Sequence, residues 1–110
     1  MVNSKKIIAR YRELKQKAPD CILLVQVGAF MQVMDNDAKA LSQLTGLKLQ
    51  MAGEIGDPVV LGGFPKSGLN AYVGAMARAG HSVSIAFQDE QKERYIKEII
   101  RVNRDEEQKP

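Results

Sequence analysis

The chain has 110 residues, a length that suits a single domain with its own hydrophobic core. Charged residues make up 26% and the net charge is +3, so the composition permits nucleic-acid binding without arguing for it. The sequence contains no apolar run of membrane-spanning length, and its first residues lack the long apolar segment expected of a signal peptide. Its single cysteine excludes an internal disulfide. We therefore expect a cytoplasmic protein with no membrane partner.

The first predicted element is a helix over residues 4–17. Ile7, Ile8, Tyr11 and Leu14 recur at helical spacing and should form its buried face. The opposite face carries basic side chains, namely Lys5, Lys6, Arg10, Arg12 and Lys17. An ordinary solvated surface is the simpler interpretation of these charges, and the alternative is a basic face beside a phosphate backbone. Cys21 follows the helix, and we expect a packed thiol there rather than a nucleophile.

The most apolar stretch, residues 23–34, organises the rest of the chain. Its β-favouring residues predict a strand, a break at Gly28-Ala29 and a second strand. Beyond the break, Phe30, Gln32 and Met34 should share one face of the sheet, with Met31 and Val33 on the other. The ring of Phe30 can stack on a base or pack in a core, and the amide of Gln32 can bond a base edge or water. The function depends on which of these occurs.

A second helix is predicted over residues 35–44, with Asp35 or Asn36 as its N-cap and Gly46 as its stop. Its buried stripe should consist of Ala38, Leu41 and Leu44. We then expect a short strand over residues 47–51, a loop over 52–58 punctuated by glycine and proline, and a strand over 59–63.

A third helix is predicted to open within residues 64–68 and to end at Gly80. The preceding Gly62-Gly63 pair lacks the spacing of a nucleotide-binding loop, so a close strand-to-helix turn is the simpler interpretation. The alternative is a DNA phosphate at this helix N-terminus, helped by Lys66. A further strand is predicted over residues 82–88. Residues 94–102 can be strand or helix, and their β-branched content favours a strand; a charged, disordered tail follows over 104–110.

The element order predicts an α/β (α+β) fold, a mixed β-sheet of about six strands surrounded by three helices, in one domain over residues 1–103. One cysteine and one histidine cannot assemble a zinc site, and no local motif signals a catalytic triad or a carboxylate pair. We therefore expect neither an enzyme nor a resident metal or cofactor in this chain.

Several motifs in succession resemble the N-terminal domain of the MutS family of DNA mismatch-repair proteins. Gly28-Ala29-Phe30-Met31-Gln32 is similar to the family's G-D-F-Y-E, and Asp37-Ala38-Lys39 to its D-A-K. The segment 56–65 is similar to G-E-P-I-P-M-A-G-I-P, and 82–88 to the strand S-V-A-I-C-E-Q. The resemblance extends from the first helix to about Val102. It implies a mismatch-recognition domain in which Phe30 is the minor-groove wedge.

From this resemblance we expect contacts with mismatched or distorted duplex DNA, made by Phe30, Gln32, Val27, Lys66 and Ser67. Gln32 replaces the family's glutamate, so it keeps hydrogen-bonding reach but loses the charge. The chain has no P-loop, so ATP and Mg²⁺ would be cofactors only if it were part of a longer MutS-like protein. A lone domain should bind weakly and be sensitive to salt, with a protein partner supplying further DNA contacts.

Two functions of different class follow. The first is a DNA-binding module related to mismatch repair and the response to DNA damage, which would place the chain at the nucleoid. The alternative is a protein-interaction or scaffold domain that keeps the fold without mismatch binding. An exposed Phe30 would support the first, and a buried Phe30 the second.

Overall fold

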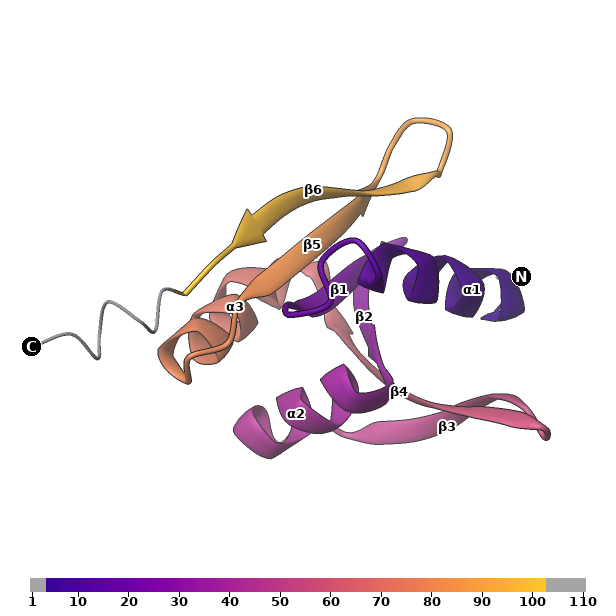
Figure 1. Ribbon diagram of the computed structural model, residues 1–110, viewed down its shortest axis with the longest axis horizontal. Coiled ribbons are helices and arrows are strands. Elements are labelled where there is room, and N and C mark those ends of the chain that lie inside the picture. The colour runs from indigo at the N-terminus through magenta and orange to yellow at the C-terminus, as the bar shows by residue number, and fades with distance from the viewer. Residues whose placement is uncertain (1–3, 103–110) are drawn as a thin grey trace, which may run out of the picture.

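The computed structural model describes residues 4–102, which form three α-helices, one short 3-10 helix and six strands (Figure 1). In chain order these elements are α1 (Ser4–Lys15), β1 (Ile22–Val27), β2 (Phe30–Met34), α2 (Asp35–Thr45), β3 (Leu49–Glu54), β4 (Asp57–Pro65), η1 (Lys66–Gly68), α3 (Leu69–Arg78), β5 (Val83–Gln88) and β6 (Arg94–Ile100). The predicted order of helices and strands is confirmed. The domain boundary at residue 103 and the tail over 104–110 lie outside the described residues and stay predictions.

Across residues 4–102 the strands form one sheet in the order β3-β4-β2-β1-β5-β6. β1 runs parallel to β5, with Ile22 opposite Val83, and every other neighbouring pair is antiparallel. The predicted mixed sheet is therefore confirmed. Residues 22–25 of β1 are buried whichever way they point, as expected for a strand that has a parallel partner and lies inside the sheet.

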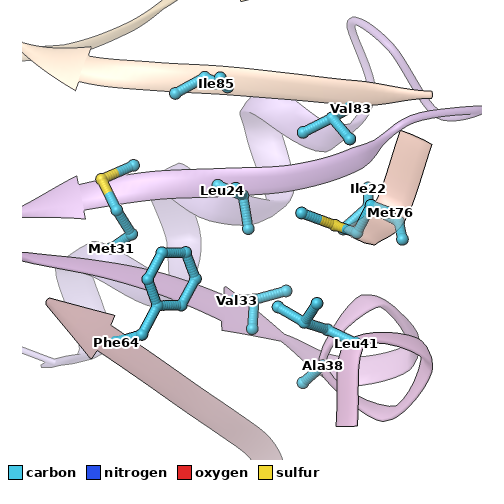
Figure 2. Close-up of a cluster of buried hydrophobic side chains, with 10 residues drawn as sticks. All are labelled: Ile22, Leu24, Met31, Val33, Ala38, Leu41, Phe64, Met76, Val83 and Ile85. Atoms are coloured by element: carbon cyan, nitrogen blue, oxygen red, sulfur yellow. The ribbon is translucent and has the colours of Figure 1, made fainter. Parts of the chain in front are cut away.

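Helices cover both faces of the sheet, and each face has its own hydrophobic cluster. On one face, α2 and α3 pack on the central strands (Figure 2), and the buried side chains there are Ile22, Leu24, Met31, Val33, Ala38, Leu41, Phe64, Met76, Val83 and Ile85. On the other face, α1 supplies the residues predicted for its buried side, and the cluster consists of Ile7, Ile8, Tyr11, Leu14, Leu23, Val25, Met34, Val59 and Ala86. The two clusters separate because successive strand residues point to opposite faces.

The alternation predicted for β2 is confirmed. Met31 and Val33 belong to the cluster under α2 and α3, whereas Met34 belongs to the cluster under α1. Phe30 and Gln32 therefore lie on the α1 face. The packing of α1 stops short of them, because Phe30 is 53% exposed and Gln32 is half-buried.

The loop predicted over residues 52–58 is wrong. β3 continues to Glu54, the chain turns at Ile55-Gly56, and β4 begins at Asp57. The proline that suggested a loop is tolerated because Pro58 pairs only with β3. β2 begins to pair with β4 at Leu61, so the other side of Pro58 needs no ladder hydrogen bond.

Three details of the helices also differ from the predictions. Neither Asp35 nor Asn36 caps α2, because the N-cap residue is Met34 in an extended conformation and no side chain bonds the helix end. Leu44 is largely exposed instead of completing the buried stripe of α2. Residues 64 and 65 remain in β4, and the turn of η1 precedes α3.

Other predictions for these segments hold. Gly46 ends α2 in the left-handed conformation, and Cys21 is a buried free thiol whose pKa is raised by burial. None of the helices within residues 4–102 is both long and apolar enough to cross a membrane.

Candidate nucleic-acid interface

Phe30 is the first residue of β2 and stands at the end of the β1–β2 hairpin. It lies opposite Val27 on one neighbouring strand and Pro65 on the other. Gly28 makes the turn possible, since its φ is +61° and residues with a Cβ rarely adopt that conformation. The hairpin thus presents an exposed aromatic ring on a short, regular support.

Two side-chain amides hold the turn in place, one from Gln26 in β1 and one from Gln88 in β5. The Gln26 Nε2 donates to the Gly28 carbonyl at 3.0 Å, and the Gly28 N–H donates to the Gln88 Oε1 at 2.7 Å. The Gln88 N–H in turn donates to the Gln26 Oε1 at 2.9 Å. These bonds, together with the Lys66 N–H to Ala29 carbonyl bond at 2.8 Å, fix the backbone immediately before Phe30.

Gln32 lies two residues beyond Phe30 on the same face, between Val25 of β1 and Gly63 of β4. Its amide has no hydrogen-bond partner within residues 4–102. Because Gly63 has no side chain, one flank of the amide is open. A shallow groove of about 380 Å³ begins there and is bordered by Phe30, Gln32, Lys48 and Gln50.

The five predicted site residues do not all converge. Val27 and Gln32 flank Phe30 on the α1 face, and Val27 packs against the cluster under α1. Lys66 meets the hairpin only through its backbone, because its Nζ lies 5.4 Å from the ring centroid of Phe87. That ring packs against the cluster under α2 and α3, on the opposite face of the sheet. Ser67 is exposed in η1 and borders neither Phe30 nor the groove beside it.

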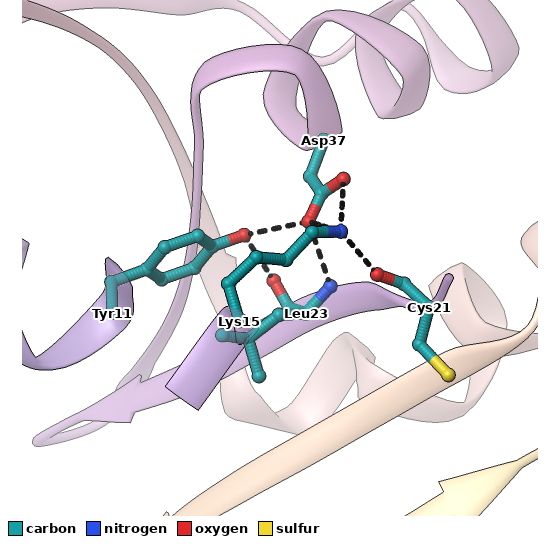
Figure 3. Close-up of polar contacts among 5 residues, drawn as sticks. All are labelled: Tyr11, Lys15, Cys21, Leu23 and Asp37. Atoms are coloured by element: carbon teal, nitrogen blue, oxygen red, sulfur yellow. Dashed lines mark hydrogen bonds and ion pairs between the residues drawn. The ribbon is translucent and has the colours of Figure 1, made fainter. Parts of the chain in front are cut away.

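Sequence reasoning missed a polar cluster that fixes α1 and α2 against β1 (Figure 3). The Asp37 carboxylate accepts hydrogen bonds from the Leu23 N–H at 3.0 Å, the Lys15 Nζ at 2.8 Å and the Tyr11 hydroxyl at 3.1 Å. The Tyr11 hydroxyl is also within 2.6 Å of the Leu23 carbonyl, and Lys15 donates to the Cys21 carbonyl. Burial and the Asp37 charge raise the pKa of Tyr11 well above its ordinary value.

The sequence offered one signal for this cluster, the three polar residues after β2, of which Asp35 or Asn36 was expected to cap the helix. Two of them are accounted for differently by the fold. Asp37 turns inward to Lys15, and the Asp35 carboxylate lies 3.8 Å from the Arg12 guanidinium. The cluster holds α1 in register with the strand that leads into the hairpin.

The β3–β4 hairpin is also bonded to α1. The Arg12 guanidinium donates to both carboxylate oxygens of Asp57, at 2.7 and 3.2 Å, and lowers the pKa of that carboxyl group. Among residues 4–102 no group of three or more His, Cys, Asp or Glu side chains is arranged to hold a metal ion.

Comparison with known proteins points to one family. The family model described as MutS domain I matches residues 5–105. The chain is 37% identical over 83 residues to the DNA mismatch repair protein MutS of Porphyromonas gingivalis, covering 74% of this chain and 9% of that protein. It is 32% identical over 92 residues to MutS of Methanothrix thermoacetophila, covering 82% of this chain and 11% of that protein. The chain thus spans about a tenth of the length of the curated relatives that it matches.

Proposed function

The chain belongs to the MutS domain I family, and on that premise we propose that it is a DNA-binding module for mismatched or distorted duplexes. Phe30 is the wedge that enters the minor groove beside the mispaired base. Val27 and Gln32 flank the wedge. A phosphate contact by Lys66 or Ser67 would have to be made away from the wedge, because neither side chain borders it. The proposal gives this chain no catalytic step, and ATP with Mg²⁺ belongs to it only as part of a longer MutS-like protein.

The observation that supports the wedge is the combination of exposure and fixed support at Phe30. The ring is 53% exposed, although it stands in a strand whose apolar neighbours Met31 and Val33 are fully buried. In the turn before it, the Gly28 carbonyl accepts a hydrogen bond from Gln26 and the Gly28 N–H donates one to Gln88. Because the backbone before the ring is already held in place, the ring can enter between two base pairs with little further loss of conformational entropy.

The wedge enters a mismatched step at a lower free-energy cost than a fully paired step. A mispaired base is already poorly stacked, so less free energy is needed to unstack it and to bend the duplex there. Stacking of a base on an aromatic ring contributes roughly 1–3 kcal/mol. Phe30 would therefore gain more at a mismatch than at a paired step, where the unstacking cost offsets the same gain.

Gln32 supplies the hydrogen bond to the displaced base. Its amide has both donors and an acceptor, and within residues 4–102 none of these is satisfied. Since the amide is neutral, it adds no repulsion toward the phosphates. We infer that Gln32 tolerates more kinds of base edge than the glutamate of the family does.

The proposal is tested by the fluorescence anisotropy of a labelled duplex with a single mismatch and of its fully paired twin, at low salt. The wild-type chain should bind the mismatched duplex more tightly, and Phe30→Ala should remove about 1–3 kcal/mol of that preference. Phe30→Leu, which keeps an apolar wedge without a ring, should retain part of it. Equal binding of both duplexes by the wild type would overturn the proposal.

Ile99→Ala is the matched control for a loss of exposed apolar surface. Ile99 is 44% exposed on β6, two strands away from the hairpin residues of β1. Its truncation should leave the preference for the mismatch unchanged. If Ile99→Ala and Phe30→Ala reduce the preference alike, the effect belongs to general surface chemistry and not to a wedge.

A protein-interaction role is the second candidate, and the β3–β4 hairpin favours it. Ile55 at the turn is fully exposed and Met51 on the edge strand β3 is 66% exposed. Exposed apolar side chains on an edge strand suit contact with another protein, including one that supplies further DNA contacts. A chain that binds neither duplex would leave this role as the supported one.

A further inference from the structure

A broad groove with an excess of positive charge lies between α1 and the β5–β6 turn. We call it the α1–β6 groove, and its volume is about 930 Å³. It is lined by five cations, Lys6, Arg10, Lys17, Lys92 and Arg94. Two carboxylates, Glu13 and Glu93, also border it, so the lining has a net charge of +3 at neutral pH. Such an excess in a concave surface attracts polyanions.

Two of these cations are held in fixed positions along the groove. The Arg10 guanidinium donates through Nε and Nη2 to the Arg94 carbonyl, at 3.0 and 2.6 Å, and lies 5.3 Å from the Tyr95 ring centroid. The Arg94 Nε donates to the Gln26 carbonyl at 2.7 Å. Partial burial lowers the pKa of Arg94, but a guanidinium remains charged at neutral pH.

Two other cations extend from the rim. Within residues 4–102, the ammonium groups of Lys17 and Lys92 have no ion-pair or hydrogen-bond partner. The turn that carries Lys92 is nevertheless ordered, because the Asp89 side chain accepts from the Gln91 and Glu93 N–H groups at 2.9 Å. The groove therefore combines fixed guanidinium groups with ammonium groups available to a ligand.

The groove ends at the hairpin that carries Phe30. Val27 and Gly28 form part of its lining, and Val27 is the cross-strand partner of Phe30. A ligand that lies along the groove would pass directly beside the proposed wedge. Lys66 points to the opposite face, and the shallow groove beside Phe30 and Gln32 is bordered by one cation, Lys48, so the α1–β6 groove has more cations than the shallow groove.

We propose that the α1–β6 groove binds the phosphate backbone of duplex DNA next to the base step that Phe30 enters, an inference that rests on the proposed function. The α1 residues that line it, from Lys6 to Glu13, extend roughly 10 Å along the helix axis. At about 3.4 Å of duplex axis per phosphate of one strand, this length corresponds to about three phosphates. The contact is independent of base sequence, so it positions the duplex without selecting the mismatch.

The double variant Lys17→Gln/Lys92→Gln tests the inference in the full chain. Each phosphate contact contributes about 0.9 to the slope of log affinity against log salt concentration, so the slope should fall by about two in magnitude. Binding to mismatched and paired duplexes should weaken by the same factor, and the preference for the mismatch should persist. Phe30→Ala should show the reverse pattern, with the slope kept and the preference lost.

The matched control is Lys39→Gln/Arg78→Gln, which removes the same charge from α2 and α3 on the opposite face. Both side chains are exposed. If this control lowers the slope as much as the groove variant does, the effect is one of net charge and the groove inference fails. It also fails if the groove variant keeps the wild-type slope, or if the wild type binds no duplex at low salt.

The two proposals can fail separately. A wild type that binds both duplexes equally, but whose salt slope depends on Lys17 and Lys92, overturns mismatch recognition and retains the groove. If the wild type clearly prefers the mismatch but Lys17→Gln/Lys92→Gln keeps the wild-type salt slope, mismatch recognition is retained and the groove inference is overturned. Circular dichroism and urea denaturation of each variant establish that the fold is intact.

Discussion

Val27 and Phe30 form the last residue pair of the β1–β2 ladder, and their side chains point to the same face of the sheet. Val27 packs against the hydrophobic cluster under α1, whereas Phe30 remains exposed. The exposed ring thus stands beside a side chain that is anchored in the core. This pairing connects the stability of the fold to the geometry of the proposed wedge, and the following predictions examine both.

Replacement of Gly28 by alanine should destabilise the domain by about 1–2 kcal/mol. An added Cβ would meet no atom within 4 Å, so the cost arises from the left-handed backbone conformation alone. Gly28→Asn should cost less, because asparagine tolerates this conformation. Urea denaturation measures the change. Gly56→Ala, in the other hairpin turn but without a positive φ, should be close to neutral, and a similar loss there would contradict the explanation.

Asp37→Asn should lower the free energy of unfolding by about 2–3 kcal/mol. The substitution keeps the size of the side chain but leaves the Lys15 ammonium without its counter-charge in a partly buried site. The amide oxygen can still accept from the Leu23 N–H, but the amide NH2 group then faces the Lys15 ammonium, which donates to both carboxylate oxygens of Asp37. The comparison is Asp35→Asn, two residues away at a position with a φ of 54° that asparagine tolerates, which should change stability by no more than about 0.5 kcal/mol.

Tyr11→Phe should cost about 1 kcal/mol at neutral pH, because the hydroxyl is hydrogen-bonded in the core. The pKa of Tyr11 is raised in the folded state by burial and by Asp37. The unfolded chain therefore loses this proton first as the pH rises above about 10, and stability falls from there toward the pKa of the folded state.

Urea denaturation between pH 8 and pH 11, in about half-unit steps, measures this dependence. The decline above about pH 10 should be weaker in Tyr11→Phe, since no proton remains to be lost at that site. Tyr95→Phe serves as the control, because Tyr95 is 44% exposed on β6. An equal decline in the wild type and in Tyr11→Phe would show that the hydroxyl of Tyr11 is not the group responsible.

Gln32→Glu should weaken binding to a paired duplex several-fold at low salt, because a carboxylate beside the wedge repels the phosphates. Binding to a mismatched duplex should weaken less, since the carboxylate can accept a hydrogen bond from a displaced base. The ratio of the two affinities, measured by anisotropy, should therefore rise. Gln50→Glu, across the shallow groove from Gln32, should lower both affinities without changing the ratio.

The sequence was sufficient for the local features of the fold. Gly28 within an apolar run predicted the break between β1 and β2, and alternation beyond it predicted which face each β2 side chain takes. Composition gave the wrong prediction where pairing between strands determines the secondary structure. Pro58 and the nearby glycines suggested a loop, but one side of β4 is unpaired there and accommodates the proline in a strand.

Long-range polar contacts could not be predicted from the sequence. Asp37 lies 14 residues from Leu23 and 22 from Lys15, and no local pattern links these positions. The side-chain amides of Gln26 and Gln88 are 62 residues apart and carry no motif that links them. For the same reason the direction of the Lys66 side chain was open, and its ammonium faces Phe87 instead of the proposed interface.

The parallel pairing of β1 with β5 has a consequence for folding kinetics. The β1–β2 hairpin closes over a two-residue turn, whereas Ile22 meets Val83 only after most of the chain lies between them. Closure of the longer loop is entropically more costly and slower. The hydrogen bonds that join Gln88 to Gly28 and Gln26 must therefore form late. A chain interrupted before β5 would contain the hairpin sequence but would lack the two bonds to Gln88 that help to hold the turn before Phe30.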